Sequence, residues 1–465
     1  MNSVLQPSFL VRNAGIFVLT VFAVAHAAGV IINFSKIDFL ALLLSGVIFV
    51  LRIIYLNRFK DFSLNAARPI LWISWDISMI VMPVLLFNIY SDSIYPNAQL
   101  VITPKDINFS ILIGVMVLTI HFFASYFYKN DKYSNTDYYP SISEMMFWIL
   151  AVMGATLWFC ALVAAKYFGT GTFNMEGNLL PYKMSGIINF FAYYFPSFYV
   201  LFLLDGVLKF KRNIFLALIP ILCLSALTAY VSLSKAAIIR PVVMIALYIV
   251  LSRRMTFWFA ITGVTLLFFA FLSGSYIASF RDSLNSIRYK TWNEMTADYG
   301  ALDYLHRVFR DGTLFQKFHA YSDTVDLSQE LESYGNNPSD LHTYGIDKTP
   351  LNSMHSSGCS TLVSAYCFGL KYVPIVAFIM SLITLFIDYR LPRSKWIFSS
   401  LLFRTYVTFY VCIIMFNLSM VQFLSPLIFG SGSIITGVLI PLAILFAYVI
   451  YIALFCRKRV DETLG

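Results

Sequence analysis

Charged residues are scarce in this chain. Of its 465 residues, 12% are Asp, Glu, Lys or Arg, whereas soluble domains carry about 25%. Hydrophobic residues make up 59% of the chain, and a water-soluble fold cannot cover that much apolar surface with so few charges. The composition therefore excludes an ordinary soluble protein and predicts an integral membrane protein.

Motifs for metals, disulfides and nucleotides are also missing. The six cysteines show no CxxC spacing, so we expect neither a zinc site nor a disulfide framework. The chain has no Walker A sequence, which excludes ATP hydrolysis through a P-loop, and no HExxH. The outer loops lack a DxD pair that could hold a metal on a sugar nucleotide, and the basic residues form no stripe suited to nucleic acid. We therefore expect no metal, no other cofactor and no nucleic acid partner.

Apolar segments of membrane-spanning length are abundant, since a spanning helix needs about 20 mostly apolar residues. The candidates are residues 14–33, 38–56, 69–90, 109–128, 145–165, 186–208, 213–233, 236–251, 255–277, 371–388, 396–418 and 433–455. The sequence thus predicts an all-α polytopic membrane protein with about twelve transmembrane helices.

Lys and Arg gather at alternate ends of these spans, as the positive-inside rule requires. Both termini then fall in the cytoplasm, and the long polar segment 278–361 falls outside. We expect three parts: spans one to nine in 1–277, a partly helical outer loop in 278–361, and a re-entrant-like segment with the last three spans in 362–465.

Two groups of cations could bind phosphate. Arg281 and Arg288 are seven residues apart on a predicted helix, hence about 10 Å apart along it, which suits a diphosphate clamp. The alternative is a solvated face that meets anionic headgroups. Lys235 and Arg240 lie at the outer end of a short span that Pro241 interrupts, a pattern that indicates a site. Snorkelling of both side chains to the interface is the alternative.

Charges and histidines inside the apolar spans are few. Asp76 and Arg404 lie at similar predicted depths, which favours a structural ion pair over a proton or substrate pathway. His26 and His121 stand alone in apolar spans, so we expect both to be packed residues and not ligands.

The chain resembles a known family at its outer-loop borders. The SKA…R segment within 232–241, the large loop two helices later, and the small-residue stretch 355–376 with its Phe368–Gly369 pair are similar to the O-antigen polymerases of the Wzy family. The likeness covers roughly 185–390. Relatives often carry a carboxylate before the Phe-Gly pair, whereas this chain has Val363 and no acid there, so the resemblance assigns no general base.

The resemblance implies a metal-independent membrane glycosyltransferase with a lipid-carrier (GT-C-like) architecture in the bacterial inner membrane. Such enzymes polymerise undecaprenyl-diphosphate-linked oligosaccharide repeat units into lipopolysaccharide O-antigen or a related surface polysaccharide. The growing glycan leaves its lipid diphosphate and joins a new lipid-linked repeat unit. Membrane lipids and a chain-length regulator protein are further expected partners.

This chemistry needs cations for the leaving diphosphate and a base for the acceptor hydroxyl. The predicted phosphate or glycan contacts are Lys235, Arg240, Arg281, Arg288, Arg307 and Arg310, and the predicted catalytic bases are His319 and His355. Three alternatives stay open: an O-antigen ligase that uses lipid A core as acceptor, a lipid-linked oligosaccharide flippase or secondary transporter, and a non-catalytic assembly protein.

Overall fold

A computed structural model describes the parts of the chain that carry most of the predicted spans. The described residues are 23–58, 67–85, 100–126, 138–140, 142–169, 184–232, 236–252, 265, 311–346, 359–391, 400–411 and 440–458. Within them nearly all regular structure is helical, and the strands are the short β1 (Tyr138–Pro140) and β2 (Cys456–Lys458). The described part of the chain therefore has the structure expected of a helical membrane protein.

The chain forms two compact units, each assembled from segments that are distant in the sequence. Unit 1 comprises Met1–Lys132, Leu305–Arg390 and Tyr410–Gly437. Unit 2 comprises Tyr133–Tyr304, Leu391–Phe409 and Val438–Gly465. The described parts of the predicted outer loop, residues 311–346 and 359–361, belong to unit 1.

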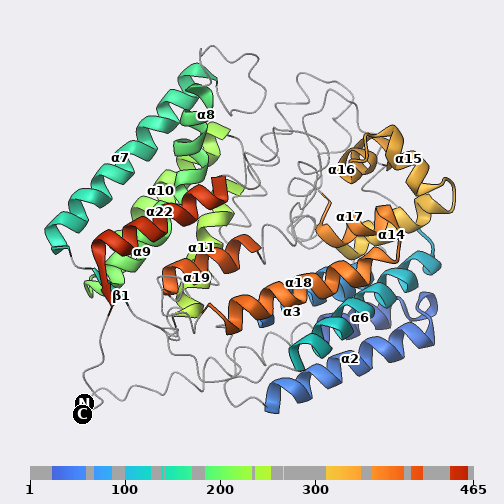
Figure 1. Ribbon diagram of the computed structural model, residues 1–465. Coiled ribbons are helices and arrows are strands. Elements are labelled where there is room, and N and C mark those ends of the chain that lie inside the picture. The colour runs from blue at the N-terminus through green and yellow to red at the C-terminus, as the bar shows by residue number, and fades with distance from the viewer. Residues whose placement is uncertain are drawn as a thin grey trace. The chain divides into compact units, whose positions relative to one another are not determined.

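Unit 1 is organised around one helix, α6. Its apolar helices are α2 (Phe39–Arg58), α3 (Ala67–Asp76), α4 (Met82–Leu85), α6 (Pro104–Tyr126) and α18 (Tyr372–Tyr389), with the short η1 (Phe34–Lys36) and η2 (Ile77–Val81). Figure 1 shows α6 between α2 and α18, and it packs against both. Because α6 contacts helices on several sides, it is the most enclosed of the long apolar helices.

Short helices from the predicted outer loop, and from the beginning of the segment that follows it, cover one end of α6. They are α14 (Asp311–Ser322), α15 (Leu327–Ser333), α16 (Pro338–Asp340), η5 (Leu341–Ile346) and α17 (Thr361–Phe368). Helix α14 packs on α6 and η2, and α17 packs on α14, α15 and α18. Nearly all of α14 is buried, so this loop helix is part of the core of unit 1.

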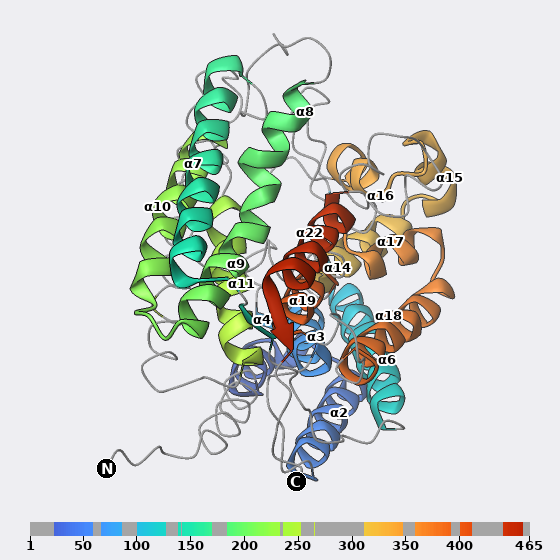
Figure 2. The same cartoon turned by 60° about the vertical axis from the view of Figure 1, so that its left-hand side comes forward.

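Unit 2 is a second helical bundle, centred on α9. Its elements are α7 (Glu144–Phe168), α8 (Met184–Asn189), η3 (Phe190–Tyr194), α9 (Phe195–Lys209), α10 (Phe215–Ser232), α11 (Ala236–Leu251), α19 (Leu401–Thr408) and α22 (Ile440–Phe455). Helix α9 contacts α7, α10, α11, α19 and α22. In Figure 2, α7 and α10 run side by side. The strands β1 and β2 pair antiparallel, with Tyr139 opposite Arg457.

Two prolines explain two widened helical turns. Both η2 and η3 are π-helical, and in each case a proline, Pro83 or Pro196, follows two residues after the π turn. Proline has no N–H, so the carbonyl four residues earlier loses its helical donor and the turn can widen. By contrast, Pro241 lies inside α11 without ending it. The prediction that Pro241 interrupts this span is wrong, because one missing hydrogen bond leaves the others in place.

Five helices in the described part of the chain are long and apolar enough to cross a membrane. They are Pro104–Tyr126, Glu144–Phe168, Met184–Lys209, Phe215–Ser232 and Tyr372–Tyr389. Each coincides within a few residues with a predicted span. Shorter apolar helices fall on several others, including α11 on the predicted 236–251. The predicted span 255–277 lies outside the described residues apart from residue 265, and the total of twelve stays a prediction.

The isolated polar residues of the spans are buried as predicted. His121 lies edge-on to Trp72 and Trp75, and its Nδ1 is 2.9 Å from the Ser381 hydroxyl, so it is a packed residue. His26 is likewise buried, 3.3 Å from Ser45 Oγ. Asp76 is buried in unit 1 and Arg404 in unit 2. Their pairing stays a prediction.

Candidate functional site

Asp106 occupies the first turn of α6, where its position follows from the local sequence. Thr103, Pro104 and Asp106 form a helix-start signature, with a capping residue, a proline at the first helical position and an acid two residues later. The Thr103 N–H and hydroxyl both donate to Asp106 Oδ2, over 2.7 and 2.6 Å. These two bonds fix the carboxylate in one orientation while leaving Oδ1 available.

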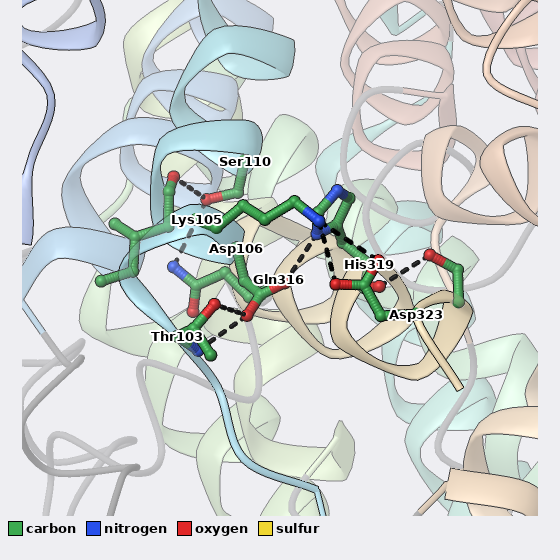
Figure 3. Close-up of polar contacts among 9 residues, drawn as sticks. Thr103, Lys105, Asp106, Ser110, Gln316, His319 and Asp323 are labelled. Atoms are coloured by element: carbon green, nitrogen blue, oxygen red, sulfur yellow. Dashed lines mark hydrogen bonds and ion pairs between the residues drawn. The ribbon is translucent and has the colours of Figure 1, made fainter.

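His319, a predicted catalytic base, meets that carboxylate. Its Nδ1 lies 2.6 Å from Asp106 Oδ1. Figure 3 shows the two side chains together with their polar neighbours. The imidazole also stacks on Phe109, one turn along α6, with ring centroids 3.9 Å apart. The Asp106 side chain is 2% exposed and that of His319 is 13% exposed, so the pair is largely shielded from water. One helix, α6, therefore holds the imidazole of the distant α14 through two different contacts.

Lys105 and Asp323 form an ion pair beside this couple. Lys105 Nζ donates to both oxygens of Asp323, at 3.0 and 3.3 Å. The hydrogen bond from Lys105 lowers the pKa of Asp323 below its usual value. Both side chains are more than half exposed, so water screens the attraction and the pair adds little stability. Its main effect is to place a positive charge beside the histidine. Lys105, Asp106, His319 and Asp323 are together called the cluster below.

The helix that carries His319 is seated by close backbone contact. The Asp311 N–H donates to Ser78 Oγ in η2 over 3.0 Å, and Gln316 reaches Ser110 Oγ over 3.3 Å. Gly312 lies against η2 so closely that an added Cβ would be 2.1 Å from Pro83 Cγ and 2.7 Å from the Ser78 carbonyl oxygen. The proline-widened turn η2 and the absence of a side chain at Gly312 thus allow α14 to pack closely on the helices of unit 1.

The stretch that resembles the family's Phe-Gly segment lies next to these residues. The described part of this stretch contains α17, which runs from Thr361 to Phe368 and has Ser360 as its N-cap. Gly369 follows with φ +136°, a conformation that side-chain-bearing residues rarely adopt. Tyr366 of α17 lies 5.5 Å from the Phe109 ring, which itself stacks on His319. This segment therefore forms part of the aromatic surroundings of the histidine.

The arrangement can carry out general base chemistry. Because Nδ1 donates to Asp106, the other ring nitrogen, Nε2, is free to accept a proton from a substrate hydroxyl. The Asp106 carboxylate also faces the positive charge that develops on the ring when it takes up a proton. No ATP, flavin or nicotinamide motif accompanies it in the sequence.

The same residues could alternatively hold a cation. One ligand atom each from Asp106, His319 and Asp323 lie within 4.8 Å of one another. Carboxylate and imidazole ligands suit divalent transition metals. However, the Lys105 ammonium already neutralises Asp323, and a metal would have to displace it. The geometry therefore favours a histidine base held by Asp106 (the Asp106–His319 dyad) over a metal site. Adding a chelator distinguishes these two possibilities.

Arg240, a predicted phosphate ligand, lies in unit 2. It is half-buried in α11 and lines a cavity of about 330 Å³ together with residues of α7, η3, α9 and α10. The remaining predicted site residues lie outside the described residues. These are Lys235, Arg281, Arg288, Arg307, Arg310 and His355.

Three members of the cluster were not predicted as site residues: Lys105, Asp106 and Asp323. Asp106 is separated from His319 by 213 positions, and no local pattern links them. The available signal was the Thr-Pro-Lys-Asp sequence, which marks a helix start on the side assigned to the outer loop.

Comparisons with known proteins identify no relative. No protein family, no curated protein and no solved structure matches the chain. Functional conclusions therefore rest on the residues themselves.

Proposed function

We propose that this protein is a polysaccharide polymerase of the bacterial inner membrane, with twelve spans and a GT-C-like architecture. It would transfer a growing glycan from undecaprenyl diphosphate onto a lipid-linked repeat unit. The observation that carries the proposal is the Asp106–His319 dyad, a buried carboxylate 2.6 Å from an imidazole on the predicted outer loop.

The dyad supplies the base that the family resemblance leaves unassigned. His319 Nε2 takes the proton of an acceptor sugar hydroxyl, and the hydroxyl oxygen attacks the anomeric carbon of the donor. A glycosidic C–O bond forms while the bond to the diphosphate breaks, and the diphosphate departs with the electron pair. Asp106 keeps the imidazole in the required tautomer and stabilises its positive charge.

The leaving diphosphate gains negative charge, which cations must offset. Arg240 is a half-buried guanidinium that lines a cavity, and this setting supports a role in phosphate binding. Lys235, Arg281, Arg288, Arg307 and Arg310 remain proposed contacts on the strength of the sequence alone.

A ligase would use the same donor and a similar base, so the dyad does not separate ligase from polymerase. A transporter or flippase has no need of a base held by a carboxylate in a loop, and the dyad counts against that class. A non-catalytic assembly protein would need neither such a base nor cations that bind a diphosphate.

The acceptor decides between polymerase and ligase. Deleting the gene should leave lipopolysaccharide or capsule capped with a single repeat unit if the protein is a polymerase. A ligase deletion would leave bare core, and a flippase deletion would leave no surface glycan. A gel of surface glycan from the deletion strain therefore tests the proposal directly.

The dyad is tested by complementation and by transfer rates. His319→Gln should lower polymerisation by purified protein about 10²- to 10⁴-fold, the usual contribution of a general base, while protein yield is retained. His121→Gln is the matched control, because that histidine packs within the apolar spans. Equal losses in both variants would contradict a catalytic role for His319.

Metal independence has its own measurement. Polymerisation of purified lipid-linked repeat units should survive EDTA, because Lys105 occupies the place of a cation beside Asp323. Loss of activity with EDTA, restored by Mg²⁺ or Mn²⁺, would assign Asp106, His319 and Asp323 to a metal site instead.

A further inference from the structure

The cavity in unit 2 is lined by both polar and aromatic groups. Its walls include Trp158 from α7, Asn189 from α8, Tyr193 and Tyr194 from η3, and Arg240 from α11. The volume of about 330 Å³ is at the small end of the range for ligand sites, roughly 300–1,000 Å³. It therefore suits a single small ring and not an extended oligosaccharide.

Two buried polar atoms of the wall have no partner among the described residues. They are the Asn189 side-chain oxygen and the Tyr193 hydroxyl. A buried polar group without a hydrogen bond destabilises the fold, so a ligand that supplies a donor and an acceptor there would be favoured. In addition, Pro241 has no N–H for the carbonyl of Ala237, and both residues line the cavity.

The charge of the wall selects for an anion. Among the residues that line the cavity, the charged side chain is that of Arg240, a cation. A guanidinium in a site with aromatic walls binds phosphate oxygens well, because its donors form a fixed fork.

The aromatic faces add a second preference. Trp158 is 1% exposed, and its Nε1–H donates to Thr228 Oγ1 over 3.1 Å, which fixes the indole in place. Tyr193 and Tyr194 come from the π-helical turn. Aromatic side chains beside hydroxyl and amide groups suit a pyranose, whose C–H face is apolar and whose edge carries hydroxyls.

The cavity also lies at a defined end of its helices. Ser232 ends α10 and Ala237 lies in the first turn of α11, so the cavity is near the connection between these helices. The basic residues Lys209, Lys211 and Arg212 lie at the opposite end of α10. By the positive-inside rule the cavity end is then the outer one.

We propose that this cavity binds one phosphorylated pyranose ring, with the phosphate on Arg240 and the ring between the aromatic residues. The inference rests on the proposed function, whose donor carries such a group at its reducing end. A free hexose phosphate has the same chemistry, and the two sources are distinguished by the probes below.

The test measures binding by the purified full-length His319→Gln protein in nanodiscs, so that binding is separate from transfer. The probes are glucose 1-phosphate, a short-chain prenyl diphosphoglucose, inorganic phosphate and glucose, each followed by calorimetry and melting temperature. Both sugar phosphates should bind at least tenfold more tightly than phosphate or glucose. If the prenyl probe binds more tightly, the ligand of the cavity is the lipid-linked sugar. If glucose 1-phosphate binds more tightly, the ligand is a free sugar phosphate.

Three variants make the assignment specific. Arg240→Gln should weaken sugar phosphate binding about ten- to a hundredfold, and Arg240→Lys should weaken it less. Tyr193→Phe should weaken binding of the sugar phosphates but not of inorganic phosphate, while raising the melting temperature without ligand, because it removes an unpartnered hydroxyl. Lys166→Gln, an exposed cation of α7, is the control and should change neither property.

Inorganic phosphate binding as tightly as the sugar phosphates would overturn the ring assignment. Sugar phosphate affinity unchanged in both Arg240→Gln and Tyr193→Phe would overturn the site. If sugar phosphates bind as expected while the deletion strain shows no polymerase phenotype, the proposed function fails and the binding site stands.

Discussion

At the scale of single residues, Asp106 is the most informative side chain. One oxygen accepts both hydrogen bonds that start α6, and the other meets His319. The helix cap therefore fixes the angle at which the carboxylate presents itself to the imidazole. A residue that would ordinarily be assigned to helix capping also positions the proposed base.

Replacing Asp106 with Asn separates these two roles. The amide keeps an oxygen for the cap but favours the wrong imidazole tautomer, so we expect transfer to fall by up to about 10⁴-fold. Thr103→Val removes only the hydroxyl contribution to the cap and should lower activity little. The measurement is the transfer rate at matched protein yield. Equal losses in the two variants would mean that Asp106 acts only as a cap.

Lys105 and Asp323 give a prediction about acid stability. Lys105 lowers the pKa of Asp323, so the stabilisation by the pair is present above the ordinary pKa of 3.8 and is lost as pH falls through the lowered value. The melting temperature of Lys105→Gln should therefore lie slightly below that of the wild type near pH 6, and the gap should close as the pH falls below 3.8. The gap should also shrink in high salt. A gap that persists at low pH would show that Lys105 acts through another contact.

At the scale of elements, the seat of α14 depends on Gly312. An added Cβ would collide with Pro83 and with the Ser78 carbonyl oxygen, and the backbone oxygen cannot move aside cheaply. Gly312→Ala should therefore destabilise the protein by about 1–3 kcal/mol and draw His319 away from Asp106. Gly46→Ala in α2 is the control, since a Cβ added there would meet nothing within 4 Å, and it should be neutral or stabilising. Melting temperature and transfer rate are the measurements.

Elements with a strong hydropathy signal could be predicted closely from the sequence. The predicted 236–251 matches α11, and 186–208 matches Met184–Lys209 within two residues. The π turn at Phe190–Tyr194 was not predicted. A π turn contains one more residue than an α-helical turn, and this difference leaves the apolar composition of the segment unchanged. His319 was predicted as a base from its residue type and loop, but its partner Asp106 was not. Contacts across 213 positions depend on how helices pack.

At the scale of the whole molecule, the dyad bears on topology. It joins the start of α6 to α14, and the cation pattern assigns both segments to the outer face. Reporter fusions after residues 174 and 335 should therefore report the outer compartment, and fusions after 130, 210 and 253 the cytoplasm. A cytoplasmic signal at 335 would move the proposed base to the wrong side for an outer lipid-linked substrate.

The β1–β2 ladder has a consequence for the order of synthesis. Tyr138–Pro140 precedes α7, whereas its partner Cys456–Lys458 follows α22 near the end of the chain. A chain still on the ribosome holds the first strand for more than 300 residues of elongation before the second is made. Unit 2 can therefore close only after Cys456–Lys458 has been synthesised, and a stop before Cys456 would leave β1 without its partner strand.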